Sequence, residues 1–388
     1  MQLGMAARLR ITIVQRLLSA LCDQGLLVAD VVITQLQSIK DLLMAQTPIT
    51  ENTCRTERHT SFYLAAGPGD GPPIIFMHGW PELSLSWRHQ LPVFGALGFR
   101  AVAPDLRGHG RSSIYDRHDA YCQREIVADM IELLDSLGFQ KAIWVGHDWG
   151  APVAWNIASH HPDRCIAVAA LNVPYRTLEM GLDAIVSLVN RETYPESDYP
   201  YGNWEYMRFY EENFEKAAQV MGANPEATIK TLFRSGNPAI RGKPTALSQV
   251  RRDGGWFGGK PSAPDLPRDE RLLSEADLAA YVSAYKRTGF FGTDSLYMNH
   301  KANAAYASEA LNGGHLEMPA LFLGAEHDYT CDTVTSRLAE PMRGYIRNLT
   351  ERRVPSGHWM AQECPVHVNA HLSGWIATHV REAWPFSR

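Results

Sequence analysis

The stretch that most constrains the fold of this chain is residues 145–150, with the sequence VGHDWG. It follows the apolar residues 142–145 and opens a helix-like segment, so it predicts a strand, a sharp turn and a helix. Glycines near Asp148 allow a strained turn to lift one side chain above a sheet. A carboxylate at that position attacks carbon and leaves an alkyl ester. For this stretch alone, an acidic cap at an ordinary helix start is the alternative interpretation.

Apolar runs and helical periodicity alternate on both sides of this turn. Apolar residues at 3.6-residue spacing from Ile126 to Leu137 predict a helix, with Gly138 as its C-terminal stop. Such alternation of strands and helices is typical of a mostly parallel, doubly wound sheet, an α/β fold. The predicted strands are residues 58–64, 73–77, 101–103, 142–145, 165–171, 320–323 and 352–354.

The pattern changes between residues 175 and 300. This segment is rich in aromatic residues and has no obvious parallel strand, while helices are predicted over residues 203–220 and after a capping box of Ser274 and Asp277. The glycine-rich residues 254–259 predict a mobile loop. The sequence therefore predicts a helical lid, residues 175–300, inserted into a core. That core consists of residues 51–174 and 301–388, with a last amphipathic helix after Pro365.

Residues 1–50 are predicted to form an N-terminal helical extension. Apolar residues at helical spacing lie beside Arg8, Arg10 and Arg16, which indicates an amphipathic helix. Its apolar runs are shorter than the roughly 18 residues of a membrane span, and no secretory cleavage site follows. We expect it to pack on the domain or to be partly disordered. A helix on a membrane surface or an organelle presequence is the alternative.

Charge and cysteine content narrow the partners and the compartment. The 388 residues carry a formal net charge of −5 without a block of like charge, which argues against nucleic acid and favours a small, weakly polar ligand. The six cysteines lack C-x-x-C spacing. They predict reduced thiols in a cytoplasmic protein rather than disulfides or metal ligands.

An ester on Asp148 has to be hydrolysed by activated water, which requires a base and a carboxylate to orient that base. In a sheet of this kind the partners follow in the order nucleophile, acid, histidine, each at the carboxyl end of a strand. Asp328 follows the strand predicted at residues 320–323, and His358 follows the strand predicted at 352–354. We therefore predict His358 as the base and Asp328 as the acid, with Glu326 as the second candidate for the acid.

The charge that develops on the ester carbonyl needs two backbone N–H donors. One is predicted to be the amide of Trp149, the residue after the nucleophile. The other is expected in the loop after residues 73–77, where Trp80 is the best candidate because Pro81 has no N–H to donate. The alternative is a plain strand-to-helix turn in which His78 is a packed imidazole.

Four segments in this strand context together resemble the soluble epoxide hydrolases of the α/β-hydrolase superfamily. They are residues 78–82 (HGWPE), 105–113 (DLRGHGRSS), 146–150 (GHDWG) and 356–359 (SGHW). The resemblance extends from about residue 58 to the C-terminus. It implies the α/β-hydrolase fold with an inserted cap and no metal or organic cofactor. It also implies that His78, Pro81 and His147 lie beside the substrate.

The same resemblance implies two lid tyrosines that hold the epoxide oxygen and protonate the departing alkoxide. Residues 203–207 (NWEYM) are similar to the first tyrosine segment, which gives Tyr206, with Tyr210 as the second choice. Residues 288–299 (TGFFGTDSLYMN) are similar to the second segment, which gives Tyr297. Leu296 stands where the family more often has tryptophan.

The sequence thus predicts a detoxifying epoxide hydrolase, monomer or homodimer, that converts a small apolar epoxide and water to a vicinal diol. A haloalkane dehalogenase is the main alternative, because it resembles this chain in the aspartate nucleophile, the histidine, the acid and the tryptophan after the nucleophile. Dehalogenases commonly have asparagine where Trp80 stands, and a halide needs N–H donors rather than tyrosines. Ester hydrolysis lacks its serine nucleophile, and a non-catalytic ligand sensor of this fold would not need the triad.

Overall fold

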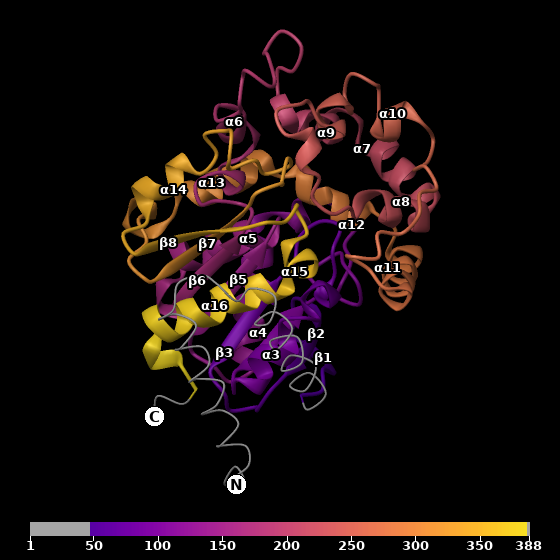
Figure 1. Ribbon diagram of the computed structural model, residues 1–388. Helices are drawn as coiled ribbons and strands as arrows, with labels where there is room; N and C mark the ends of the chain where they lie inside the picture. Colours follow the sequence, from indigo (N-terminus) through magenta and orange to yellow (C-terminus); the bar gives the residue numbers. More distant parts are fainter. Residues whose placement is uncertain (1–46, 386–388) are drawn as a thin grey trace, which may run out of the picture. The chain divides into compact units, whose positions relative to one another are not determined.

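The computed structural model of the protein describes residues 47–385, drawn as a ribbon in Figure 1. The helix predicted within residues 1–45 lies outside the described residues. Among the helices of residues 47–385, none is both long enough and apolar enough to cross a membrane.

A central sheet contains the strands β1 (Thr50–Arg55), β2 (Thr60–Ala66), β3 (Pro73–Met77), β4 (Arg100–Pro104), β5 (Ala142–His147), β6 (Cys165–Leu171), β7 (Ala320–Ala325) and β8 (Leu349–Val354). Their order across the sheet is β1-β2-β4-β3-β5-β6-β7-β8. β2 pairs antiparallel with β1 and β4, and every other neighbouring pair is parallel. The predicted parallel sheet is confirmed, and β1 is a strand that the sequence analysis did not predict.

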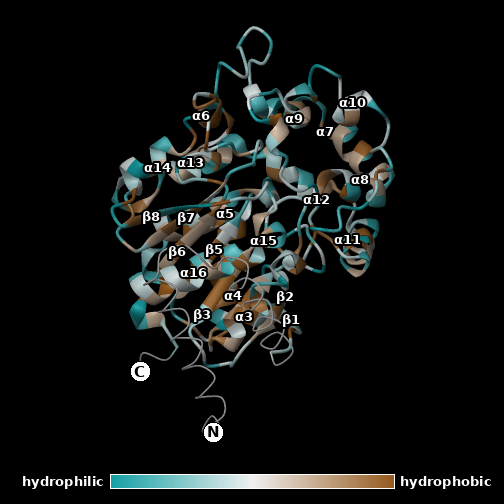
Figure 2. Ribbon diagram, in the orientation of Figure 1, coloured by the Kyte–Doolittle hydropathy of each residue, from teal (hydrophilic) through white to brown (hydrophobic). Residues whose placement is uncertain are grey.

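Helices cover both faces of the central strands, which explains why these strands are continuously apolar. One face carries α3 (Leu91–Ala96) and α16 (Pro365–His379), and the other carries α4 (Gln123–Ser136) and α5 (Gly150–His160). β3 sends Ile74 and Phe76 to the first face and Ile75 and Met77 to the second. In Figure 2 these central strands carry the brown of hydrophobic residues.

The segment between β6 and β7 consists of helices and loops. Its α-helices are α6 (Leu182–Val186), α7 (Glu205–Ala223), α8 (Pro225–Leu232), α9 (Ala246–Gln249), α10 (Trp256–Gly259), α11 (Glu275–Thr288), α12 (Phe291–Asp294) and α13 (His300–Ser308), seen in magenta to orange in Figure 1. The predicted capping box of Ser274 and Asp277 starts α11. Residues 254–259, where a mobile loop was expected, contain the short helix α10, whose Trp256 is buried. We refer to this segment as the cap.

Short helices complete the connections around the sheet. They include η1 (Ser84–Trp87) after β3, and within the cap η5 (Gly202–Trp204) before α7 and η7 (Ser295–Met298) after α12. The others are η2 (His118–Tyr121), η3 (Pro162–Arg164), η4 (Leu178–Met180), η6 (Pro238–Ile240), η8 (Leu311–Gly314), η9 (Arg381–Ala383), α14 (Glu340–Tyr345) and α15 (Met360–Glu363).

Candidate active site

Asp148 lies on a sharp turn between β5 and α5. Its φ of +49° is in the left-handed region, which residues other than glycine rarely adopt. The turn is tight, because a Cβ on Gly146 would stand 2.2 Å from the carbonyl oxygen of Gly150. A Cβ on Gly150 would in turn stand 2.3 Å from the carbonyl oxygen of Met77. The glycines therefore allow the turn that holds the Asp148 carboxyl group at the carboxyl end of the sheet.

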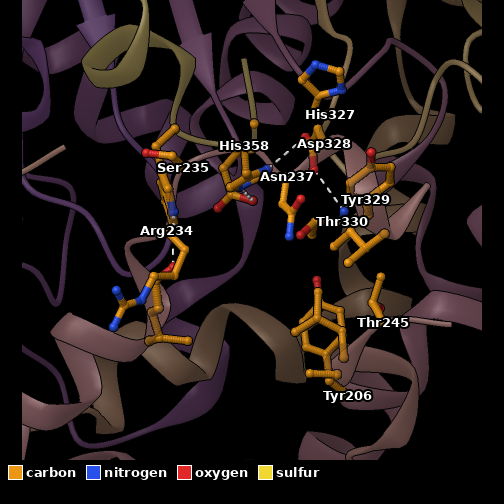
Figure 3. Close-up of a pocket in the computed structure, with 18 of the residues that line it drawn as sticks. Tyr206, Arg234, Ser235, Asn237, Thr245, His327, Asp328, Tyr329, Thr330 and His358 are labelled. Carbon is orange, nitrogen blue, oxygen red and sulfur yellow. Dashed lines mark hydrogen bonds and ion pairs between the residues drawn. The ribbon is translucent and has the colours of Figure 1, made fainter. Parts of the chain in front are cut away.

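Asp148, His358 and Asp328 form a continuous polar chain. The Nε2 atom of His358 lies 3.4 Å from Oδ2 of Asp148, and its Nδ1 atom lies 2.8 Å from Oδ2 of Asp328. Figure 3 shows the second of these contacts as a dashed line. The three residues follow β5, β8 and β7, the strand ends at which the sequence analysis expected them. Asp328, not Glu326, is the carboxylate bonded to the imidazole.

Asp328 is held by three N–H donors besides His358. Its Oδ1 atom accepts hydrogen bonds from the amides of Thr330 at 2.8 Å and Cys331 at 3.0 Å. Its Oδ2 atom accepts one from the side-chain amide of Asn172. Burial alone would raise the pKa of Asp328, but His358, the Asn172 side chain and the Cys331 amide lower it to about 2. Asp328 is therefore an anion at neutral pH.

The imidazole of His358 lies between two carboxylates. Burial acts to lower its pKa, but Asp328 and Asp148 outweigh burial and raise the pKa of His358 well above its ordinary value. The resting imidazole is therefore protonated. Neutralising either carboxylate would lower the pKa of His358.

The backbone after β3 supplies an N–H donor to the nucleophile. The amide of Trp80 donates a hydrogen bond to Oδ1 of Asp148 at 2.7 Å. A Cβ on Gly79 would stand 2.3 Å from that same Oδ1 and 2.5 Å from the Trp149 nitrogen. Gly79 therefore has to be glycine for the Trp80 loop to approach the turn at Asp148, and the Trp149 nitrogen lies close to the same glycine.

A cavity of about 550 Å³ opens in front of Asp148. Tyr206 from α7 and Tyr297 from η7 line it together with His358. Figure 3 shows Tyr206 across the cavity from His358 and Asp328. The wall also contains apolar side chains, among them Leu232, Ile240, Leu247, Trp256 and Trp359.

Both tyrosines are buried and lie against fixed neighbours. Burial raises the pKa of Tyr206 and of Tyr297 well above the ordinary value, so both hydroxyl groups stay protonated at neutral pH. Asn203, just before Tyr206, donates a hydrogen bond to the Thr330 carbonyl at 2.7 Å. This bond joins the cap to the loop that contains Asp328. Tyr210, the second choice for the first tyrosine, stacks face to face on the Tyr297 ring at 4.6 Å.

The wall formed by the described residues does not include His78, Pro81 or His147, in contrast to the expectation from the sequence. The Nε2 atom of His78 accepts a hydrogen bond from the Leu106 amide at 3.0 Å, and Nδ1 bonds the Gly79 carbonyl at 2.9 Å. Burial lowers the pKa of His78 to about 4, so the ring is neutral. The packed imidazole, which was the alternative interpretation, describes His78.

His147 contacts the backbone of His358. Its Nδ1 atom lies 2.7 Å from Oε2 of Glu82, and its Nε2 atom lies 2.8 Å from the backbone carbonyl of His358. Both neighbouring oxygen atoms are hydrogen-bond acceptors. Burial acts to raise the pKa of Glu82, but the ring of His147 lowers it to about 2. Glu82 also accepts from the Gly79 amide at 3.0 Å, so one carboxylate fixes both loops beside the nucleophile.

Two kinds of residue in the site escaped the sequence analysis. Asn172 follows β6 directly, and a polar residue at that strand end was a usable signal. Trp256 and the loop residues of the cap wall carried no such signal, because the segment between α8 and α11 has no periodicity that predicts which side chains face inward.

Comparisons with known proteins show the family to which this chain belongs. The family model described as alpha/beta hydrolase fold matches residues 72–363. Epoxide hydrolase A of Mycobacterium tuberculosis is 34% identical over 315 residues, covering 80% of this chain and 91% of that protein. Bifunctional epoxide hydrolase 2 of Sus scrofa is 28% identical over 363 residues, which cover 91% of this chain but 61% of the Sus scrofa protein.

A solved structure of an epoxide hydrolase is also similar to this chain. The crystal structure of epoxide hydrolase A from Mycobacterium thermoresistibile matches with a TM-score of 0.68 and 30% sequence identity, covering 85% of this chain and 99% of that one. The resemblance inferred from four short motifs is therefore confirmed over most of the chain. The chain belongs to the epoxide hydrolase family of the α/β-hydrolase fold.

Proposed function

We propose that this chain hydrolyses epoxides to vicinal diols through a covalent ester on Asp148. The observation that carries the proposal is the setting of one carboxylate. Oδ1 of Asp148 accepts the Trp80 amide, and Oδ2 lies beside His358. The same carboxylate opens onto a cavity that Tyr206 and Tyr297 line.

In the first step, Oδ2 of Asp148 attacks a ring carbon and the carbon–oxygen bond of the epoxide breaks. Oδ1 already accepts a hydrogen bond, so Oδ2 is the freer nucleophile and Oδ1 becomes the carbonyl oxygen of the ester. Tyr206 and Tyr297 hold the epoxide oxygen, and one of them transfers its proton to the departing alkoxide. Their raised pKa values keep that proton available until the ring opens.

In the second step, His358 removes a proton from water, which attacks the ester carbonyl carbon. Ester formation abolishes the charge on Asp148, so the pKa of His358 falls and the imidazolium gives its proton to the tyrosinate left by ring opening. The neutral imidazole is then the base, and Asp328 keeps it oriented. The Trp80 amide, with that of Trp149, receives the charge that develops on Oδ1.

The protons then return to their starting places. The diol oxygen bound to the acyl carbon leaves with the proton held by His358. The carboxylic acid left on Asp148 gives its proton to the neutral imidazole of His358, which restores the resting ion pair. The net reaction is one epoxide and one water to one diol, and it uses no metal or organic cofactor.

The hydrogen bond made by the Trp80 indole favours an epoxide over a haloalkane as the substrate. A departing halide needs N–H donors aimed at it, but the Trp80 indole N–H donates to Asp294 at 2.7 Å. Two tyrosine hydroxyl groups line the cavity instead, and they suit an oxygen leaving group.

The walls of the cavity suggest the kind of substrate. Several of its side chains are aliphatic or aromatic, which suits a small apolar epoxide. The five described cysteines are free thiols, which fits a cytoplasmic protein. The proposed role is the removal of reactive epoxides, by a monomer or a homodimer.

A product assay with styrene oxide, a fatty-acid epoxide and a haloalkane tests the function. We expect diol from at least one epoxide and no halide release. The Asp148→Ala protein should form no diol, because no other carboxylate lies on the turn between β5 and α5. Diol formation by that variant would contradict the assignment of the nucleophile, and halide release by the unaltered chain would favour the dehalogenase.

A further inference from the structure

One buried acid of the cap has no part in the mechanism above. Asp294 is the last residue of α12 and has no exposed surface. Its Oδ1 atom accepts a hydrogen bond from the Trp80 indole nitrogen at 2.7 Å. Within the described residues its Oδ2 atom has no hydrogen-bond partner. A buried acid in this setting requires an explanation, because burying a carboxyl group costs free energy.

The hydrogen bond joins the cap to the loop that supplies the oxyanion donor. Trp80 is held at both ends: its backbone amide donates to Asp148, and its indole donates to Asp294. Asp294 directly precedes η7, the short helix that carries Tyr297. The Trp80 ring also packs edge-on against Tyr297, with the ring centres 5.6 Å apart. A shift of η7 therefore moves the acceptor of the Trp80 indole and one proposed proton donor together.

The environment of Asp294 favours its neutral form. Burial raises the pKa of Asp294 to about 8, against the opposing effects of the Trp80 hydrogen bond and of the nearby Tyr210 and Thr293 side chains. Tyr285 of α11, another buried hydroxyl group, lies near Asp294. At neutral pH the neutral acid can accept from the Trp80 indole without placing a second negative charge near the forming oxyanion.

We propose that Asp294 is a positioning residue for ester hydrolysis: by holding the Trp80 indole, it keeps the oxyanion amide in register with the cap segment that carries Tyr297. This inference rests on the proposed epoxide hydrolysis. Asp294 acts through Trp80 and touches neither substrate nor nucleophile.

Four variants of the full chain test the coupling. Asp294→Leu keeps the size but removes the acceptor, Asp294→Asn keeps an acceptor without charge, and Trp80→Phe removes the indole donor but keeps the backbone amide. The fourth variant combines Trp80→Phe with Asp294→Leu. Asp253→Leu is the matched control, because Asp253 is an exposed acid of the same cap. Rapid-quench mass spectrometry measures ester formation and ester hydrolysis separately, and thermal melting reports folding.

We expect Asp294→Leu and Trp80→Phe each to slow ester hydrolysis by about tenfold or more, with a smaller effect on ester formation. The rate of ester hydrolysis in Asp294→Asn should stay within about threefold of the rate in the unaltered chain. Packing alone would not give such a rescue. The double variant should be no slower than either single variant, because it leaves neither polar atom unpaired. Asp253→Leu should change neither rate.

Either of two results would overturn the inference. One is ester hydrolysis at the unaltered rate in Asp294→Leu. The other is a double variant whose loss of ester-hydrolysis rate is the product of the losses in the two single variants. If Asp294→Leu does not fold, Trp80→Phe takes its place in the test. Its rate of ester hydrolysis is then compared with the rates of the double variant and of Asp294→Asn. Absence of diol from the unaltered chain would reject the proposed function together with this inference. Diol formation with an unaffected Asp294→Leu would reject the inference alone.

Discussion

The Nε2 atom of His358 lies 3.4 Å from Oδ2 of Asp148, while Oδ1 of the same carboxylate accepts the Trp80 amide at 2.7 Å. The two oxygens thus have different neighbours, and the difference assigns them different roles. The oxygen held by the amide suits the carbonyl of an ester. The oxygen beside the imidazole suits the bond to substrate, and it leaves the imidazole close to the carbon that water must attack.

Replacement of His358 by glutamine should separate the two half-reactions. Asp148 and both tyrosines remain, so the ester still forms, but no base activates water. We expect steady turnover to fall by about a thousandfold or more. Intact-mass spectrometry should find one substrate-sized adduct per chain, on the peptide that contains Asp148. A protein without the adduct, or with normal turnover, would contradict this order of events.

Replacement of the cap tyrosines by phenylalanine should slow ring opening and leave ester hydrolysis nearly unchanged. Each single change, Tyr206→Phe or Tyr297→Phe, should lower the rate of ester formation by about 10-fold to 100-fold, because the second hydroxyl group still polarises the oxygen. The double change should abolish ester formation. Tyr210→Phe is the informative comparison, since its ring stacks on Tyr297 but does not line the cavity. Normal ring opening in the double variant would require another proton donor.

Several features of this fold and site follow from the sequence because strand ends and strand order decide them. Residues 73–77 and 165–171 are strands with the predicted bounds, since a strand buried on both faces is a continuous apolar run. Asp328 and His358 lie where a residue after a parallel strand must lie. Orientation is harder to predict: His147 and His78 turn away from the cavity because Glu82 and the Leu106 amide hold them, and these contacts arise only in the folded chain.

Alanine at Gly79 should disable the site at the point where two loops meet. The added Cβ would stand 2.3 Å from Oδ1 of Asp148 and 2.5 Å from the Trp149 nitrogen, so the carboxylate or a loop has to move. We expect the rate of diol formation to fall by about a hundredfold or more, because reacting groups displaced by an ångström lose alignment. Gly69→Ala is the matched control, since its Cβ would meet nothing within 4 Å. Equal activity of the two variants would contradict the close approach.

The pair of Glu82 and His147 should make stability depend on pH in the acid range. The pKa of Glu82 in the folded chain is about 2, below the ordinary value of 4.5, so folding favours its anionic form. Stability from this group is therefore fully present above about pH 4.5 and is lost as the pH falls towards 2. Glu82→Gln should lower the free energy of unfolding at pH 7 by about 3 to 5 kcal/mol, the cost of breaking a buried pair.

Urea denaturation of both proteins at pH 7, 4.5 and 3 measures this dependence. The difference in unfolding free energy between the unaltered chain and Glu82→Gln should narrow between pH 4.5 and 3, because in this range the unfolded chain binds a proton at Glu82 while the folded chain keeps the anion. Glu270→Gln is the control, since the Glu270 side chain is 82% exposed and its difference should stay small at every pH. A Glu82 difference that is constant with pH would mean that Glu82 is not held as an anion beside His147.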